Sequence, residues 1–199
     1  MNNISTEVSD PFEVLEAWYN DEMASAPLKY AAACVVSTIG LDGFPNARTV
    51  SIKGLKAPHL IFTTYFDSSK GLEILENNQV ALTFWWDHSQ RQIRIRGTAT
   101  ALSKEECDKQ FGKRNKSAQA LCLVSRQSKP MNDEDTLRKA HSEKLNEYKD
   151  NPIPRPSYWG GFQVLPNSIE FLELKESRFH NRVCFTRNET GWKALKLQP

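Results

Sequence analysis

Residues 92–97, with the sequence Gln-Ile-Arg-Ile-Arg-Gly, decide the fold of this chain. In an extended strand Ile93 and Ile95 point to one side, and the glutamine and arginines point to the other. Residues 80–86, just upstream, form a continuous apolar run, which predicts a strand covered on both faces. The polar residues 87–90 separate the two strands, so we expect them to pair as an antiparallel hairpin at the centre of the fold.

Length and composition predict one globular domain over residues 1–199, with a flexible tail at residues 1–9. The net charge of +2 comes from 26 basic and 24 acidic residues, which argues against a general nucleic-acid surface. The four cysteines have neither C-x-x-C nor metal-ligand spacing, so we expect reduced thiols and no metal. There is no signal peptide at the N-terminus and no apolar run near ~20 residues, so we expect a cytoplasmic protein without a membrane partner.

Further strands and helices surround the hairpin. We expect strands at residues 31–39, 48–53, 59–65, 158–165, 168–174, 182–187 and 191–197. We expect helices at residues 10–24, 67–77, 103–111, 118–124 and 133–148. Asp10 and Ser103 are expected to cap the first and third of these, and the last has a predicted buried stripe of Leu137, Ala140, Leu145 and Tyr148. The sequence therefore predicts a mainly antiparallel β-barrel with peripheral helices, α+β in class.

The chemistry must come from scattered polar residues, because the chain has no G-x-G-x-x-G, P-loop, H-E-x-x-H or G-x-S-x-G motif. Basic, hydroxyl and amide side chains recur at strand ends, and singly each is typical of a solvated surface. They are Arg48, Ser51, Lys53, Thr63, Thr64, Ser69, Lys70, Gln92, Gln127, Ser128, Arg178, His180 and Arg182. The helix start near Lys70 can bind an anion through its free N–H groups.

Taken in order, these residues resemble the pyridoxamine 5′-phosphate oxidase family over about residues 10–199. The resemblance is carried by residues 48–53 (RTVSIK), 68–70, 76–78, 91–92, 124–128 (VSRQS), 156–162 (PSYWGGF), 169–171, 178–182 (RFHNR) and 191–199. It implies an FMN-binding split β-barrel that forms a homodimer, with the flavin at the subunit interface.

The resemblance also implies a role for each matching residue. FMN contacts would come from Arg48, Thr49, Val50, Ser51, Ile52, Lys53, Thr63, Thr64, Ser69, Lys70, Gln92, Gln127, Ser128, Leu172 and Arg182. Substrate contacts would come from Lys53, Gln110, Arg114, Ser117, Ala118, Arg178 and His180. Lys53 and Arg114 would hold the substrate phosphate, and Arg178 and His180 would lie over its ring as the catalytic residues. A dianionic phosphate favours this combination of cations with hydroxyl and amide donors.

The chain departs from the family pattern at six of its positions. Gln110 and Ala118 replace a tyrosine and a serine, Leu172 a tryptophan, Ser69 an arginine, Thr63 a tyrosine, and Asn181 an aspartate. Each donor lost from a buried phosphate costs ~1–3 kcal/mol. The resemblance therefore predicts FMN binding more firmly than it predicts the substrate.

The implied reaction belongs to vitamin B6 metabolism and the biosynthesis of pyridoxal phosphate. Hydride would pass from C4′ of pyridoxamine or pyridoxine 5′-phosphate to flavin N5, and oxygen would reoxidise the flavin to give hydrogen peroxide. One alternative is an FMN oxidase of another aromatic substrate, similar to the phenazine-precursor oxidases; Gln110 and Ala118 favour it, while Lys53 and Arg114 oppose it. The other alternative is a flavin- or pyridoxal-phosphate-binding protein without turnover, for which Leu172 and Asn181 leave room.

Overall fold

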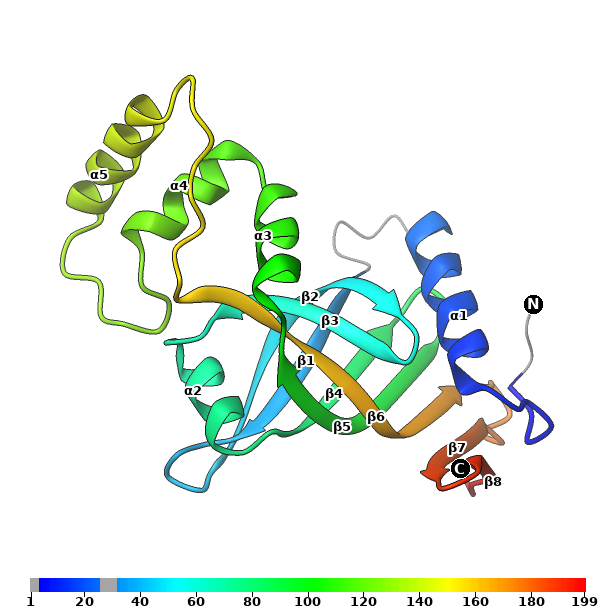
Figure 1. Cartoon of the computed structure of the whole chain (residues 1–199). Helices are drawn as coiled ribbons and strands as arrows, with labels where there is room; N and C mark the ends of the chain where they lie inside the picture. Colours follow the sequence, from blue (N-terminus) through cyan, green and yellow to red (C-terminus); the bar gives the residue numbers. More distant parts are fainter. Residues whose placement is uncertain (1–3, 26–31) are drawn as a thin grey trace.

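The fold is a closed antiparallel barrel that carries a two-stranded extension (Figure 1). The computed structural model describes residues 4–25 and 32–199, so the predicted strand start at residue 31 lies outside the described residues. Within them the strands are β1 (Ala33–Ile39), β2 (Pro45–Lys56), β3 (His59–Tyr65), β4 (Gln79–Trp86), β5 (Arg91–Ala101), β6 (Trp159–Glu173), β7 (Asn181–Asn188) and β8 (Gly191–Lys196). They are ordered β3-β2-β1-β4-β5-β6-β7-β8, and the pairing of β3 with β6 closes a six-stranded barrel. The predicted fold class is confirmed.

The hairpin predicted at the centre is the β4–β5 pair, in register from Gln79↔Thr98 to Trp86↔Arg91. Ile93 and Ile95 lie in the core, as predicted. The prediction that residues 80–86 are covered on both faces is wrong for the single chain. Burial alternates along β4, and Trp85 on the outer face of the barrel is 49% exposed.

Strand β6 replaces the two strands predicted at residues 158–165 and 168–174. The strand continues through Pro166, although proline cannot donate to a ladder. In the structure Pro166 lies opposite Gly97, where the β5–β6 register shifts. A Cβ on Gly97 would lie 2.4 Å from the Leu165 carbonyl oxygen, so only glycine permits this close approach. Beyond this point the free edge of β6 pairs with β7 instead of β3.

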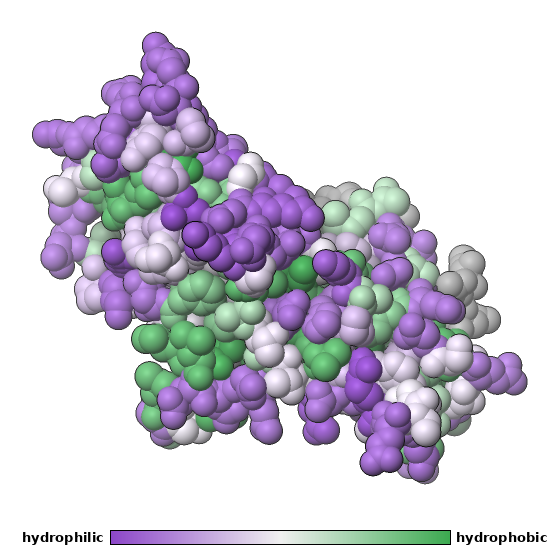
Figure 2. Space-filling view, in the orientation of Figure 1, coloured by the Kyte–Doolittle hydropathy of each residue, from purple (hydrophilic) through white to green (hydrophobic). Residues whose placement is uncertain are grey.

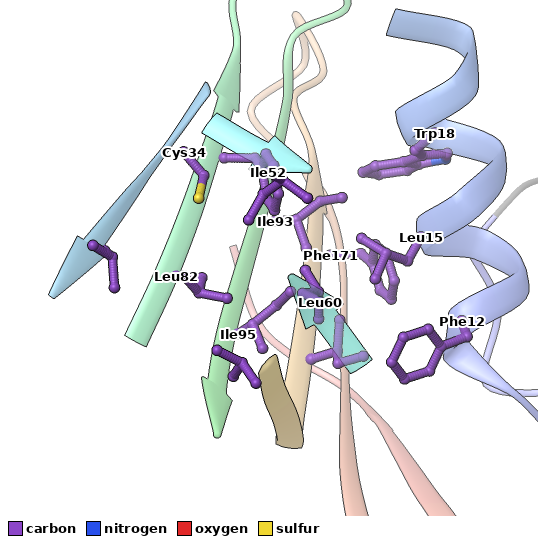
Figure 3. Packing of buried hydrophobic residues seen from close by; sticks show 14 of the residues in the cluster. Phe12, Leu15, Trp18, Cys34, Ile52, Leu60, Leu82, Ile93, Ile95 and Phe171 are labelled. Atoms are coloured by element: carbon purple, nitrogen blue, oxygen red, sulfur yellow. The ribbon is translucent and has the colours of Figure 1, made fainter. Parts of the chain in front are cut away.

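Helix α1 (Pro11–Ser25) covers one end of the barrel with Phe12, Leu15 and Trp18, which point into the core (Figure 3). Its first turn is capped as predicted, since the Phe12 N–H donates to Asp10 Oδ1 at 3.0 Å. Residues 1–9 were predicted to be a flexible tail, yet Ile4 within the described part is only 5% exposed and joins the core cluster. This part of the segment packs on the domain.

The other helices are α2 (Ser69–Glu76), α3 (Lys104–Gly112), α4 (Lys116–Val124) and α5 (Glu134–Glu147). Helices α4 and α5 pair with each other and project away from the barrel (Figure 1). The predicted buried stripe of α5 is wrong, because α5 has no fully buried residue and its apolar residues are only half-buried. In the described part of the chain, no helix is long and apolar enough to cross a membrane.

Candidate functional site

A polar cavity of about 460 Å³ opens where β2, α2 and the segment after α4 meet. We call it the Lys70 pocket. Its lining contains Arg48, Ser69, Lys70, Gln127 and Ser128, all expected from the sequence, together with Asn46 and Glu73. The structure therefore brings together five of the predicted FMN residues from three separate parts of the chain.

Lys70 is the buried cation of this pocket, with only 7% of the residue exposed. Its Nζ donates to Thr64 Oγ1 at 3.0 Å and to Gln127 Oε1 at 2.8 Å. Burial, and then the nearby Arg48 charge, lower the pKa of Lys70 to about 8. No carboxylate in the described part of the chain forms an ion pair with Lys70, so a bound anion would supply the missing charge.

Tight backbone packing fixes Lys70 at the start of α2. The Ser68 side chain caps the helix by accepting from the Gly71 N–H at 3.2 Å. A Cβ on Gly71 would lie 2.4 Å from the carbonyl oxygens of both Tyr65 and Phe66, so glycine allows the helix to press against the end of β3. The first N–H groups of α2 and the Lys70 charge therefore lie at one place, which suits a phosphate.

Glu73 is a pocket residue that the sequence reasoning missed. It is 4% exposed, accepts from Asn46 Nδ2 at 2.8 Å, and forms an ion pair with Arg48 at 2.9 Å. Burial would raise the pKa of Glu73, but hydrogen bonds from Thr38, Arg48 and Asn46 and the Arg48 charge hold it below its usual value. Glu73 thus fixes Arg48 at the pocket; its position one turn after Lys70 on α2 was the available signal.

A second cavity, of about 280 Å³, lies between β2, β3 and the α3–α4 connection; we call it the Arg114 pocket. It is lined by Lys53, Thr63, Gln110, Arg114 and Ala118, all predicted, and by Lys113 and Asn115, which the sequence reasoning missed. Thr63 and Thr64 point to opposite faces of β3, so this strand divides the two pockets.

The Arg114 pocket also carries unsatisfied positive charge. Arg114 Nε is buried and has no hydrogen-bond partner among the described residues, and its guanidinium lies 5.3 Å from the centre of the Trp159 ring. Burial and the Arg114 charge lower the pKa of Lys53. Gln110 donates to Glu106 at 2.8 Å. Ser117 lies outside this pocket, on the α4–α5 side, where its Oγ is 3.3 Å from His141 Nε2.

The remaining predicted residues of β2 have different surroundings. Thr49, Ser51 and Lys53 share the outward face of β2, and Lys53 Nζ donates to Ser51 Oγ at 3.3 Å. Ile52 points into the core and is 3% exposed, and Val50 packs partly against the same cluster. Ile52 can therefore meet a ligand only through its backbone.

A third group lies at the far end of β6. Gln92, Leu172 and Arg182 are neighbours across β5, β6 and β7, and Arg182 Nε donates to Glu170 Oε1 at 2.8 Å. The β6–β7 loop next to them carries the two predicted catalytic residues, Arg178 and His180.

Arg178 and His180 are held in a tight turn. Arg178 has a φ of 67°, a conformation that is costly for a residue with a side chain and is common at functional sites. His180 Nδ1 accepts from the Lys175 N–H at 3.0 Å, so the neutral ring carries its proton on Nε2. That N–H is left to donate to a ligand.

This third group is far from the two pockets within one chain. Thr64 at the Lys70 pocket pairs with Gly160, whereas Arg182 pairs with Leu172. Positions 160 and 172 of β6 are twelve residue steps apart, which corresponds to roughly 40 Å of extended strand. Figure 1 shows the same separation, with α2 at one end of the barrel and β7 at the other.

Two family comparisons cover most of the chain. The sequence model described as pyridoxamine 5′-phosphate oxidase matches residues 20–146. The chain belongs to this FMN-dependent oxidoreductase family. The model of the pyridoxine 5′-phosphate oxidase C-terminal dimerisation region matches residues 159–199.

Individual relatives of the family are similar to this chain over nearly its whole length. The pyridoxine/pyridoxamine 5′-phosphate oxidase of Gluconobacter oxydans is 38% identical over 96% of this chain and 95% of its own. That of Rubrobacter xylanophilus is 37% identical over 96% of this chain and 87% of its own. Among solved structures, PhzG from Burkholderia lata 383, in complex with tetrahydrophenazine-1-carboxylic acid, aligns with a TM-score of 0.91 at 28% identity, covering 97% of this chain and 94% of its own. The family relationship therefore rests on both sequence and structure.

Proposed function

We propose that the protein oxidises pyridoxamine or pyridoxine 5′-phosphate to pyridoxal 5′-phosphate, using FMN and oxygen and releasing hydrogen peroxide. One observation carries the proposal: two cation-lined pockets lie on the two sides of β3. The Lys70 pocket would bind the phosphate of the cofactor, and the Arg114 pocket would bind the phosphate of the substrate. The proposal thus gives an anionic partner to Lys70, which forms no ion pair among the described residues, and to Arg114, whose buried Nε has no hydrogen-bond partner among them.

The Lys70 pocket fits the FMN phosphate. Arg48 and Lys70 supply charge, Gln127 and Ser128 supply amide and hydroxyl groups, and Glu73 orients Arg48. Bound FMN would supply the hydride acceptor that no side chain can provide. Ser69, in place of the family's arginine, leaves one cation fewer than the usual pattern, but the remaining donors are assembled.

A C2 homodimer would complete the site. In this arrangement the end of β6 and β7 from a second copy brings Gln92, Leu172 and Arg182 to the flavin, since they are too far from the pockets of their own chain. The match of residues 159–199 to a dimerisation region supports this arrangement. Exposed apolar residues also gather over α2 and the β1–β2 turn (Figure 2), namely Leu41, Phe44, Leu72 and Leu75.

The chain's own residues would act mainly by positioning. Lys53 and Arg114 hold the substrate phosphate, while Arg178 and the Nε2–H of His180 lie against the ring from the partner copy's loop. These contacts would place C4′ at reaction distance from the flavin. None of the proposed contacts is a dedicated strong base, so the residues orient the reactants and stabilise charge.

A second candidate is oxidation of an aromatic carboxylate. Ala118 has no hydroxyl, and the Gln110 amide is turned toward Glu106, so the Arg114 pocket has fewer donors than a phosphate prefers. A carboxylate needs fewer hydrogen-bond donors than a phosphate does. The 28%-identical PhzG structure, solved with tetrahydrophenazine-1-carboxylic acid, is the relevant comparison.

Steady-state peroxide release by the FMN-loaded protein separates these functions. The panel contains pyridoxamine and pyridoxine 5′-phosphates, their unphosphorylated forms and a reduced phenazine carboxylate. We expect turnover with the phosphorylated vitamers and a large loss without the phosphate. Turnover of the carboxylate alone would select the second candidate, and no peroxide from any compound would refute both.

A further inference from the structure

Gln127 and Ser128 form one wall of the Lys70 pocket, although both residues are exposed, as is Arg126 before them. Gln127 makes the inward contact, accepting from Lys70 Nζ at 2.8 Å and from Thr64 Oγ1 at 3.2 Å. Ser128 next to it has a φ of 69°, which is costly for a residue other than glycine. An exposed segment in this conformation needs support from outside the pocket.

That support comes from Arg126, which does not line the pocket. Its guanidinium carbon lies 3.3 Å from the centre of the Tyr158 ring, and its Nη1 lies 3.6 Å from Asp67 Oδ2. Tyr158 is itself fixed, because its hydroxyl donates to the Cys122 carbonyl at 3.0 Å. Arg126 thus ties the segment after α4 to the turn between β3 and α2.

A second pair of contacts acts beside the first. Tyr65 stacks on Tyr158 with ring centres 6.2 Å apart, and the Tyr65 hydroxyl lies 2.9 Å from Ser125 Oγ. The segment after α4 is therefore joined to β3 and the turn that follows it on two sides. Gln127 makes the contacts inside the pocket, and Arg126 with Asp67 and Ser125 with Tyr65 make those outside it, while Tyr158 supports Arg126. A planar guanidinium is required for the outer contact, since a lysine ammonium does not stack on a ring in the same way.

We propose that Arg126 is a positioning residue for the cofactor: it holds Gln127 and Ser128 in the conformation that receives the FMN phosphate, without touching FMN. The inference rests on the proposed placement of the FMN phosphate in the Lys70 pocket. It predicts that Arg126 affects FMN affinity only through the segment that it positions.

The test compares FMN dissociation constants, measured by flavin fluorescence, for wild type, Arg126→Ala and Arg126→Lys. We expect Arg126→Ala to bind FMN about 3- to 30-fold more weakly, and Arg126→Lys to fall between it and wild type. The matched control is Arg138→Ala, which removes an exposed arginine paired with Glu134 on α5 and should leave the dissociation constant unchanged. Thermal unfolding of each apo variant shows whether the fold is kept; if Arg126→Ala does not fold, Arg126→Lys decides.

A double-mutant cycle separates positioning from a general structural effect. In the Gln127→Ala background, Arg126→Ala should weaken FMN binding less than it does in wild type, because one of the two groups that it positions is gone and only Ser128 remains. An undiminished effect in that background, or equal FMN affinity of wild type and both Arg126 variants, overturns the inference. A wild-type protein that binds no FMN would instead refute the proposed function.

Discussion

Replacing Lys70 with methionine should weaken FMN binding. It should also remove the pH-dependent loss of folding stability that burying a protonated Lys70 causes in the apo protein. Lys70 is 7% exposed and has no ion-pair partner among the described residues, and its pKa is lowered to about 8 from 10.5. The FMN phosphate would provide that partner. Loss of a charge-assisted contact of about 1.5–3 kcal/mol corresponds to a dissociation constant about 10- to 150-fold higher.

The same pKa fixes the sign of the stability effect. Between pH 8 and 10.5 the unfolded chain holds a proton on Lys70 that the folded apo protein has released. The free energy of unfolding of the wild type should therefore rise with pH relative to Lys70→Met. Over the whole pH range the free energy of unfolding of the wild type should rise by about 3 kcal/mol relative to that of Lys70→Met. About 2 kcal/mol of this rise should appear between about pH 7 and pH 9.5.

Urea unfolding of apo wild type and apo Lys70→Met at several pH values measures this difference, and flavin fluorescence measures FMN binding. Lys139→Met, on the exposed side of α5, is the matched control and should show neither effect. Wild-type affinity for FMN should also fall above pH 8, where binding must take up a proton, and that of Lys70→Met should not. A stability difference independent of pH, together with unchanged FMN affinity, would refute the reasoning.

Three further predictions concern the cofactor, the assembly and the two arginines of the β6–β7 region. The purified protein should be yellow and prefer FMN over FAD; a colourless protein that takes up no added FMN contradicts this, with chromatography of heat-released cofactor as the assay. Light scattering should show a homodimer, against the 22.7 kDa expected of a monomer. Arg178→Ala should keep FMN but lower kcat/KM by roughly 30- to 1000-fold, whereas Arg182→Ala should weaken FMN first; the reverse pattern would show that the two roles are exchanged.

Local signals in the sequence were enough to predict most of the elements. The alternation of Ile93 and Ile95 and the capping residues Asp10 and Ser103 predicted their strand and helices correctly. The prediction of two strands at residues 158–165 and 168–174 was wrong, because the continuation of β6 between them depends on the neighbouring strands. Strand β6 continues because the β5–β6 register shifts at Gly97 and because the other edge of β6 pairs first with β3 and then with β7.

The site was predictable as a set of residues but not as an arrangement. The family pattern indicated Arg48, Lys70 and Gln127, and the structure brings these together. Glu73 was missed because a carboxylate in a predicted anion site has no meaning until its contact with Arg48 is seen. The position of Glu73 one turn after Lys70 places it near the site, but no local pattern shows its contact with Arg48, which joins a strand to a helix 25 residues later.

The predicted FMN residues fall into two groups at opposite ends of one chain, and this separation is the physical reason to expect a second copy of the chain at the site. Arg182 pairs with Glu170 and lies half-buried at the end of the sheet opposite the Lys70 pocket. One flat ligand cannot reach both places along a strand that is roughly 40 Å long between them. In the proposed homodimer a two-fold axis would resolve this, because it would bring the β7 end of each chain to the α2 end of the other and make two equal sites. Mixed dimers of Lys70→Met and Arg182→Ala chains would then contain one site with both changes and one with neither, so they should recover activity that each pure variant lacks.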